Sequence, residues 1–146
     1  TTGPYPSFND ITIANLRGFL TALSSQGIYV DLNLHVGYQF RPATDQIPAL
    51  SGQSIPNQSK PLHIFFPRMV ELQQQFTLGL VDRLKLKGDP VLALVEINNE
   101  SSLVQAWQGG QLDPVLDGEY RTALTRQWNQ WLAARYASTP EKARSR

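Results

Sequence analysis

The sequence predicts an α/β fold built on parallel strands. Amphipathic helical patterns alternate along the chain with short β-rich segments. The resulting order, helix, strand, helix, strand, helix, is typical of parallel strands joined through helical crossovers. The chain has 146 residues, of which 41% are hydrophobic, and this is the size and composition of one globular domain. Because two parallel strands leave both sheet edges open, we expect further strands outside this sequence.

The first helix is expected over residues 9–26 and the first strand over residues 28–36. The helix has apolar side chains at helical spacing, at Ile13, Leu16, Leu20 and Leu23. Asn9 or Asp10 can cap its start, and Gly27 can end it. In the strand, alternation places Ile28, Val30, Leu32, Leu34 and Val36 on one face and Tyr29, Asp31, Asn33 and His35 on the other.

Residues 37–67 are predicted to form a long irregular loop between the first strand and the next helix. Prolines at positions 42, 48, 56, 61 and 67 interrupt this segment, which is also rich in Ser and Gln. Loops of such length are usually functional or disordered. A second helix is expected over residues 68–87, with Pro67 at its first turn and Gly88 after its end.

The second strand is expected over residues 91–99 and the third helix over residues 118–137. The run from Val91 to Val95 is continuously apolar, which is typical of a strand buried on both faces of a parallel sheet. The third helix offers a broad apolar face that includes Trp128 and Trp131. The tail, residues 138–146, is polar and basic, and we expect it to fray.

Composition argues against several classes of partner. A net charge of +1 does not favour nucleic acid or an anionic membrane surface. No apolar run approaches the roughly 18 residues of a membrane-spanning helix. With no Cys and only two His, we expect neither disulfides nor a metal, and no cofactor. Lack of Cys suits an exported protein as well as a cytosolic one, and an extracellular or periplasmic location is slightly favoured.

Polar residues gather at the ends of both expected strands. They are Asp31, Asn33 and His35 on the first strand and Glu96, Asn98, Asn99 and Glu100 on the second. Ligands of parallel α/β folds bind at the carboxyl ends of the strands. Glu96 and Glu100 are separated by about 13 Å in an extended strand, whereas the paired carboxyls of glycosidases lie roughly 5 to 9.5 Å apart. These two residues therefore cannot form such a pair.

Three segments resemble the third and fourth βα units of clan A glycoside hydrolases, of the cellulase and β-galactosidase kind. They are residues 27–37, the helix start Pro67-Arg68-Met69, and residues 89–100. Trp128-Asn129, Trp131-Leu132 and Tyr136 resemble the helix after the fourth strand in bacterial members. The resemblance covers most of positions 9–137. Its most specific element is Asn99-Glu100 at the end of a strand.

The resemblance implies a retaining glycoside hydrolase that acts on a β-linked oligosaccharide or polysaccharide. It implies a partial (β/α)₈ TIM barrel, with residues 1–146 as a single incomplete catalytic-domain fragment, because a full barrel has roughly 250 residues. Glu100 would be the general acid/base, and Asn99 would hold the sugar 2-hydroxyl. The family's nucleophile is a glutamate at the end of the seventh strand, which this chain lacks. We therefore expect the fragment alone to be inactive.

For the other candidate residues, a role in binding is expected for some, and for others two alternatives remain. His35 matches a position that lines the sugar pocket in relatives, and a purely structural histidine is the equal alternative. Trp107 can stack on a sugar ring or pack in the core, and Tyr38 is a weaker candidate for substrate contact. We expect Trp128 and Trp131 to pack against the barrel and His63 to have no role. Polar residues on the two strands, Asp31, Asn33, Glu96 and Asn98, are expected to form a hydrogen-bonded network inside the barrel.

Two alternatives stand beside this interpretation. The first is a non-catalytic carbohydrate-binding barrel that has lost its nucleophile. The second is a small stand-alone α/β domain whose strand ends bind another ligand. That domain would need additional strands between Gly37 and Pro67, and a structure without them excludes it. The sequence indicates neither the sugar and its linkage nor the oligomeric state.

Overall fold

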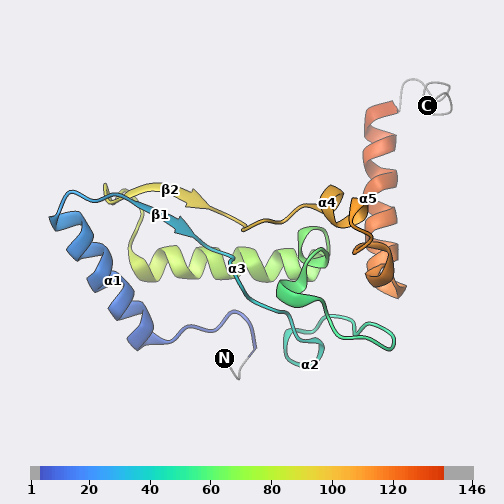
Figure 1. Ribbon diagram of the computed structural model, residues 1–146, viewed down its shortest axis with the longest axis horizontal. Coiled ribbons are helices and arrows are strands. Elements are labelled where there is room, and N and C mark those ends of the chain that lie inside the picture. The colour runs from blue at the N-terminus through green and yellow to red at the C-terminus, as the bar shows by residue number, and fades with distance from the viewer. Residues whose placement is uncertain (1–3, 137–146) are drawn as a thin grey trace.

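The computed structural model describes residues 4–136 and shows a mixed α/β arrangement (Figure 1). Its helices are α1 (Asp10–Ser25), α2 (Pro42–Asp45), α3 (Pro67–Leu84), α4 (Leu103–Gln108) and α5 (Gly118–Tyr136), and its strands are β1 (Val30–Asn33) and β2 (Leu92–Glu96). Short 3₁₀ helices are η1 (Asn57–Ser59), η2 (Leu62–Ile64) and η3 (Asp113–Val115). The tail predicted to fray, residues 138–146, lies outside the described residues.

Strands β1 and β2 pair in parallel, as the alternation of helices and strands predicts. Asp31 lies opposite Leu94 and Asn33 lies opposite Glu96, with an irregularity in the register after Val30. The helix α3 connects the two strands, so they form a βαβ unit. Asn9 caps α1 by accepting a hydrogen bond from the Thr12 amide at 3.0 Å. The α/β class is thus confirmed by a two-stranded parallel sheet within residues 4–136.

Helices α1 and α3 cover the same face of this sheet, and Figure 1 shows both on one side of the strands. The smaller of two hydrophobic cores lies between them. Leu20 of α1 packs there with Leu80 and Leu84 of α3 and with Leu34, which follows β1. Burial of such aliphatic side chains contributes roughly 1.5–3 kcal/mol each. The opposite face of the sheet has no layer over it among the described residues, so Leu94 is 65% exposed.

The prediction that the second strand is buried on both faces is wrong for residues 4–136. Val91 is buried, but Leu94 and Val95 are 65% and 43% exposed. The physical reason is that β2 has β1 on one side only and helices on one face only. Ile28 and Val36, placed with the apolar face by alternation, are both 50% exposed because they lie beyond the paired part of β1.

Residues 37–67 contain only short helices and form the centre of the larger core. The segment contains α2, η1 and η2. It buries Phe40, Ile47, Leu50, Ile55, Leu62, Phe65 and Phe66 against Met69 and Leu72 of α3. Between Gly37 and Pro67 the only β pairing is an isolated bridge between Leu50 and Gln53. The stand-alone domain with hidden strands is therefore excluded.

The helix α5 is attached through its first turns and then projects from the rest of the chain (Figure 1). Tyr120 is 1% exposed and donates from its hydroxyl to the Pro48 carbonyl at 2.7 Å. Gln127 donates to the Phe65 carbonyl at 2.6 Å. Beyond this point Trp128 and Trp131 stack on each other and are 57% and 50% exposed. The prediction that these two indoles pack in a core is wrong for the described residues.

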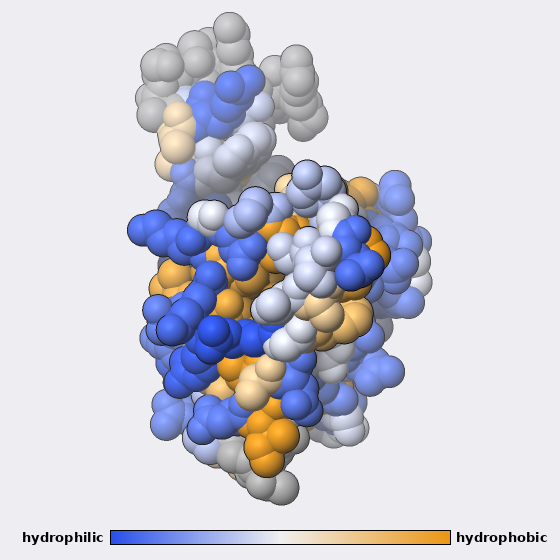
Figure 2. All heavy atoms as spheres, turned by 90° about the vertical axis from the view of Figure 1, so that its left-hand side faces the viewer, coloured by the Kyte–Doolittle hydropathy of each residue, from blue (hydrophilic) through white to orange (hydrophobic). Residues whose placement is uncertain are grey.

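Apolar side chains also reach the surface on the end of the molecule that carries α1. Figure 2 shows apolar surface between hydrophilic residues on this end. Ile11 and Phe19 of α1 are 74% and 59% exposed. Within residues 4–136, none of the helices has the length and apolar character needed to cross a bilayer.

Candidate functional site

The carboxyl ends of β1 and β2 bring together three of the polar residues expected there. Asn33 donates from its side-chain amide to a Glu96 carboxylate oxygen and to Asn99 Oδ1, the latter at 3.3 Å. The Asn99 side chain is therefore tied to the neighbouring strand on the open face of the sheet. Asn98 has a buried side-chain oxygen without a hydrogen-bond partner among the described residues.

Glu100 follows immediately and lies exposed at the same end of the sheet. It lines a hollow of about 490 Å³ together with Lys60, Gln105 and Gln111. These residues come from the segment after β1 and from α4 and its end, which are connections on the carboxyl side of the strands. The Glu100 backbone has φ = +48°, in the left-handed region that non-glycine residues rarely occupy.

His35 lies at the end of β1 but points toward α3. Its Nε2 is 3.1 Å from Thr77 Oγ1, and its Nδ1 is 3.4 Å from Tyr5 Oη. The ring also contacts Phe76, and the residue is 8% exposed. Burial, and secondarily the nearby His63, lower the pKa of His35, which favours the neutral imidazole. The contact with substrate expected for His35 stays a prediction.

His63, for which the sequence predicts no role, is buried and hydrogen-bonded. Its Nδ1 lies 2.7 Å from the Gln58 carbonyl oxygen and its Nε2 lies 2.8 Å from Ser101 Oγ. Burial lowers the pKa of His63, with the Gln58 carbonyl acting in the opposite direction and Lys60 adding to the decrease. Both histidines line a cavity of about 570 Å³ between α3 and the segment after β2. Only the fold brings His63 next to Ser101, since 38 positions separate them.

A buried carboxylate, Asp45, organises the part of the segment in which Tyr38 lies. Asp45 accepts hydrogen bonds from the Tyr5 amide, the Tyr38 hydroxyl and the Arg41 amide at 3.0, 2.8 and 2.7 Å. Tyr38 also stacks on Tyr5 with ring centroids 4.0 Å apart. Burial, and then the bond to Asp45, raise the pKa of Tyr38 to about 12. Neither Tyr5 nor Asp45 stands out in the sequence, because both belong to apparently irregular segments.

Trp107 lies on α4 and is 60% exposed. The alternative that it packs in a core is therefore wrong for the described residues. Its indole makes no ring contact among these residues, and it is not among the residues that line the hollow at Glu100. Stacking on a sugar ring stays a prediction.

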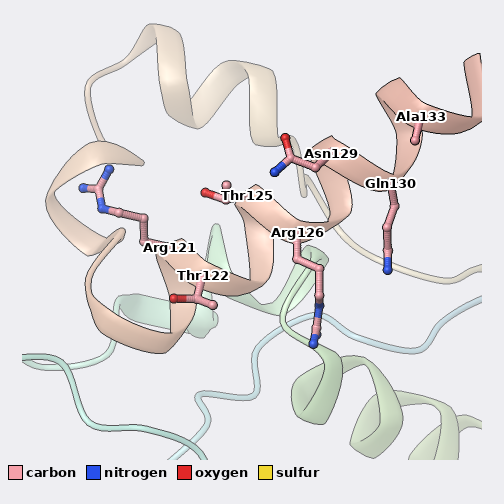
Figure 3. Close-up of a pocket in the computed structure, with 7 residues that line it drawn as sticks. All are labelled: Arg121, Thr122, Thr125, Arg126, Asn129, Gln130 and Ala133. Carbon is pink, nitrogen blue, oxygen red and sulfur yellow. The ribbon is translucent and has the colours of Figure 1, made fainter. Parts of the chain in front are cut away.

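A further hollow of about 660 Å³ lies along α5 and contains none of the predicted site residues (Figure 3). All of its lining residues belong to this one helix, so no second wall faces them. Arg121 and Arg126 point in different directions in Figure 3 and do not converge on one ligand. In the described part of the chain, moreover, no three His, Asp or Glu side chains gather to hold a metal ion.

Comparison of the chain with models of known protein families, with curated proteins and with solved structures found no match in any of the three.

Proposed function

We propose that this chain is part of the (β/α)₈ barrel of a retaining glycoside hydrolase acting on a β-linked glycan or β-glycoside, with Glu100 as general acid/base. The observation that carries the proposal is the position of Asn99 and Glu100. They lie three and four residues after the end of β2, and Asn99 is tied to Asn33 at the end of the parallel neighbour β1. An Asn–Glu pair at this end of a parallel strand is the feature shared with clan A enzymes.

The arrangement of the helices supports a barrel over a doubly wound sheet. In a doubly wound sheet helices cover both faces, whereas in a barrel they all lie outside. Here α1 and α3 pack together on one face, while the other face carries Asp31, Asn33 and Glu96. In a closed barrel this second face becomes the interior, where the Asn33–Glu96 hydrogen bond offsets the cost of burying polar groups.

The proposed chemistry proceeds in two steps with retention at the anomeric carbon. In the first step, Glu100 donates its proton to the glycosidic oxygen while a carboxylate attacks the anomeric carbon and the leaving group departs. In the second step, the Glu100 carboxylate takes a proton from water, which attacks the glycosyl-enzyme and releases the sugar. Exposure of Glu100 in the 490 Å³ hollow gives a saccharide access to its carboxyl group.

The nucleophile is expected from a strand outside this chain. Retaining enzymes place the two carboxyl groups roughly 5–5.5 Å apart. Glu96 lies four residues before Glu100 and is hydrogen-bonded to Asn33, so it does not fit this role. We therefore expect the chain alone to be inactive and the complete product of its gene to be active.

The test compares Glu100→Gln with the wild type in the complete gene product. We expect turnover of aryl β-glycosides with poor leaving groups to fall by roughly 10² to 10⁴, and that of activated substrates to fall less. Azide should restore part of the activity and yield a β-glycosyl azide, because this nucleophile needs no general base. The matched control is Glu71→Gln, an exposed carboxylate on α3.

Unchanged turnover of poor substrates by Glu100→Gln would contradict the proposal. A complete gene product that binds β-glycans but hydrolyses none of them would support the non-catalytic barrel instead. Isothermal titration with oligosaccharides separates these two outcomes, because it detects binding without turnover.

A further inference from the structure

The backbone at Glu100 is held in a conformation that its sequence does not favour. Its φ of +48° is left-handed, and this costs a non-glycine residue roughly 1–2 kcal/mol. Such conformations persist only where surrounding interactions determine them. The exposed Glu100 side chain has no hydrogen bond among those described, so the restraint must come from its neighbours in the chain.

The neighbour on the C-terminal side, Ser101, is fixed by His63. The Gln58 carbonyl oxygen can only accept a hydrogen bond, so His63 Nδ1, 2.7 Å away, carries the proton. In the neutral imidazole Nε2 is then an acceptor, and the Ser101 hydroxyl donates to it at 2.8 Å. The second contact of this hydroxyl, to the Asn99 carbonyl oxygen, is longer at 3.3 Å.

His63 is itself fixed from two sides. Its main-chain carbonyl accepts a hydrogen bond from Gln73 Nε2 of α3 at 2.8 Å, and the residue is 5% exposed. Gln58, which orients the imidazole, has φ = +55° and so is a second strained residue of the same chain of contacts. Hydrogen bonds between Gln58 and His63 and between His63 and Ser101 thus link the segment 37–67 to the residue next to Glu100.

We infer that His63 is a positioning residue that holds Glu100, through Ser101, in the orientation from which its carboxyl group reaches the leaving oxygen. The inference rests on the proposed function of Glu100. His63 does not touch the substrate: it lines the 570 Å³ cavity, whereas Glu100 lines the 490 Å³ hollow, and Ser101 lies at the boundary of both. Loss of the His63 to Ser101 hydrogen bond should therefore impair proton donation and leave substrate binding intact.

The test uses His63→Leu, Ser101→Ala and the double variant in the complete gene product. With poor leaving groups we expect each single variant to lower kcat about tenfold at unchanged KM, less than the roughly 10² to 10⁴ for loss of the acid itself. With activated leaving groups we expect little change in kcat/KM, which reports the first step, since these leaving groups need no proton. Their kcat should still fall, because the second step needs Glu100 as general base. The double variant should be no worse than either single variant, because both remove the same hydrogen bond.

Two further variants separate positioning from folding. His63→Gln keeps an acceptor oxygen near the Nε2 position and should recover much of the loss. Tyr120→Phe removes another buried hydrogen bond to the segment 37–67, at Pro48, and should leave the leaving-group dependence unchanged. If His63→Leu does not fold, Ser101→Ala, which removes one hydroxyl, gives the same comparison.

Equal loss of kcat/KM with poor and activated leaving groups, or additive effects in the double variant, would overturn the inference while Glu100→Gln still identified the acid. If Glu100→Gln itself leaves turnover of poor substrates unchanged, the proposed function fails and the inference fails with it.

Discussion

The histidines of the described chain, His35 and His63, are both held neutral by burial. In the unfolded chain each binds a proton near its ordinary pKa of 6.5. Because the folded pKa values are lower, the unfolded state binds more protons below that pH. We therefore expect the free energy of unfolding to be constant above about pH 7.5 and to decrease as the pH falls through about 6.5. Urea unfolding at a series of pH values measures this.

The control for this prediction is His63→Gln, which removes one of the two titrating groups and should reduce the slope between about pH 7.5 and 5.5. This range lies above the ordinary pKa values of the carboxylates, so their titration contributes little. A urea midpoint independent of pH over the range would show that neither imidazole is held neutral.

Asp45 carries a second prediction at the scale of single residues. Its side chain is 0% exposed and accepts hydrogen bonds from Tyr5, Tyr38 and Arg41. In Asp45→Asn, an amide NH₂ replaces one acceptor oxygen and faces these donors. We expect a loss of about 2–4 kcal/mol in the free energy of unfolding.

The matched control for Asp45→Asn is Glu71→Gln. Glu71 pairs with Arg68 at 2.8 Å, but its side chain is 52% exposed. We expect its replacement to change stability by less than about 0.5 kcal/mol. Equal effects of the two substitutions in urea unfolding would show that the Asp45 carboxylate contributes no more than a surface charge.

Sequence reasoning identified some residues of this site and missed others for a clear physical reason. Asn99 and Glu100 follow a strand signal, so their place at this end of the sheet is predictable, although β2 ends at Glu96 and not at residue 99 as predicted. His63 and Asp45 lie among prolines and polar residues with no periodicity, and only tertiary packing gives them partners. The available signal was the density of large apolar residues in the segment, such as Phe40, Leu62 and Phe65, which is unusual for a solvated loop.

At the scale of elements, periodicity located the helices better than their ends. The second helix, expected over residues 68–87, ends at Leu84 because Lys85 adopts φ = +54°. This turn brings Leu86 back into the smaller core, where it is 3% exposed. Burial of Leu86 thus outweighs continuation of the helix toward Gly88, an outcome set by long-range packing and absent from any local pattern.

A prediction at the scale of elements concerns the packing of the start of the chain against α3. A Cβ added at Gly79 would lie 2.8 Å from the ring of Phe8, which stacks on Phe76 and lies under the Arg83 guanidinium. Gly→Ala inside a helix ordinarily stabilises by about 1 kcal/mol. We expect no gain from Gly79→Ala in the wild type and the full gain in a Phe8→Ala background.

Urea unfolding of the four proteins of this cycle gives the coupling between the two positions, expected at about 1 kcal/mol. The same gain in both backgrounds would mean that the Phe8 ring moves aside freely and does not fix the approach to α3.

For the whole molecule, the α/β class and the parallel pairing were predictable, whereas the exposure of apolar surface was not. The sequence pattern of β2 and α5 is that of buried elements, yet Leu94, Trp128 and Trp131 are exposed in residues 4–136. The hydrophobic pattern of an element indicates which of its faces is suited to burial. Whether that face is buried depends on which other elements are present.

Tryptophan fluorescence tests this exposure directly. Trp107, Trp128 and Trp131 are 60%, 57% and 50% exposed. We therefore expect the folded chain to emit almost as far to the red as the urea-unfolded chain and to be quenched by acrylamide to a similar extent. An emission maximum that is blue-shifted in the fold and moves strongly on unfolding would show that these indoles are covered.

Phe76 of α3 contacts both hydrophobic cores, and the two halves of that helix otherwise serve different clusters. One half supports the sheet, and the other supports the segment with His63. Regions that share so few buried side chains can open separately. Amide hydrogen exchange should then show two protection classes along α3, with the boundary near Phe76. Changes that loosen the half of α3 under the sheet would then leave the half beside His63 protected.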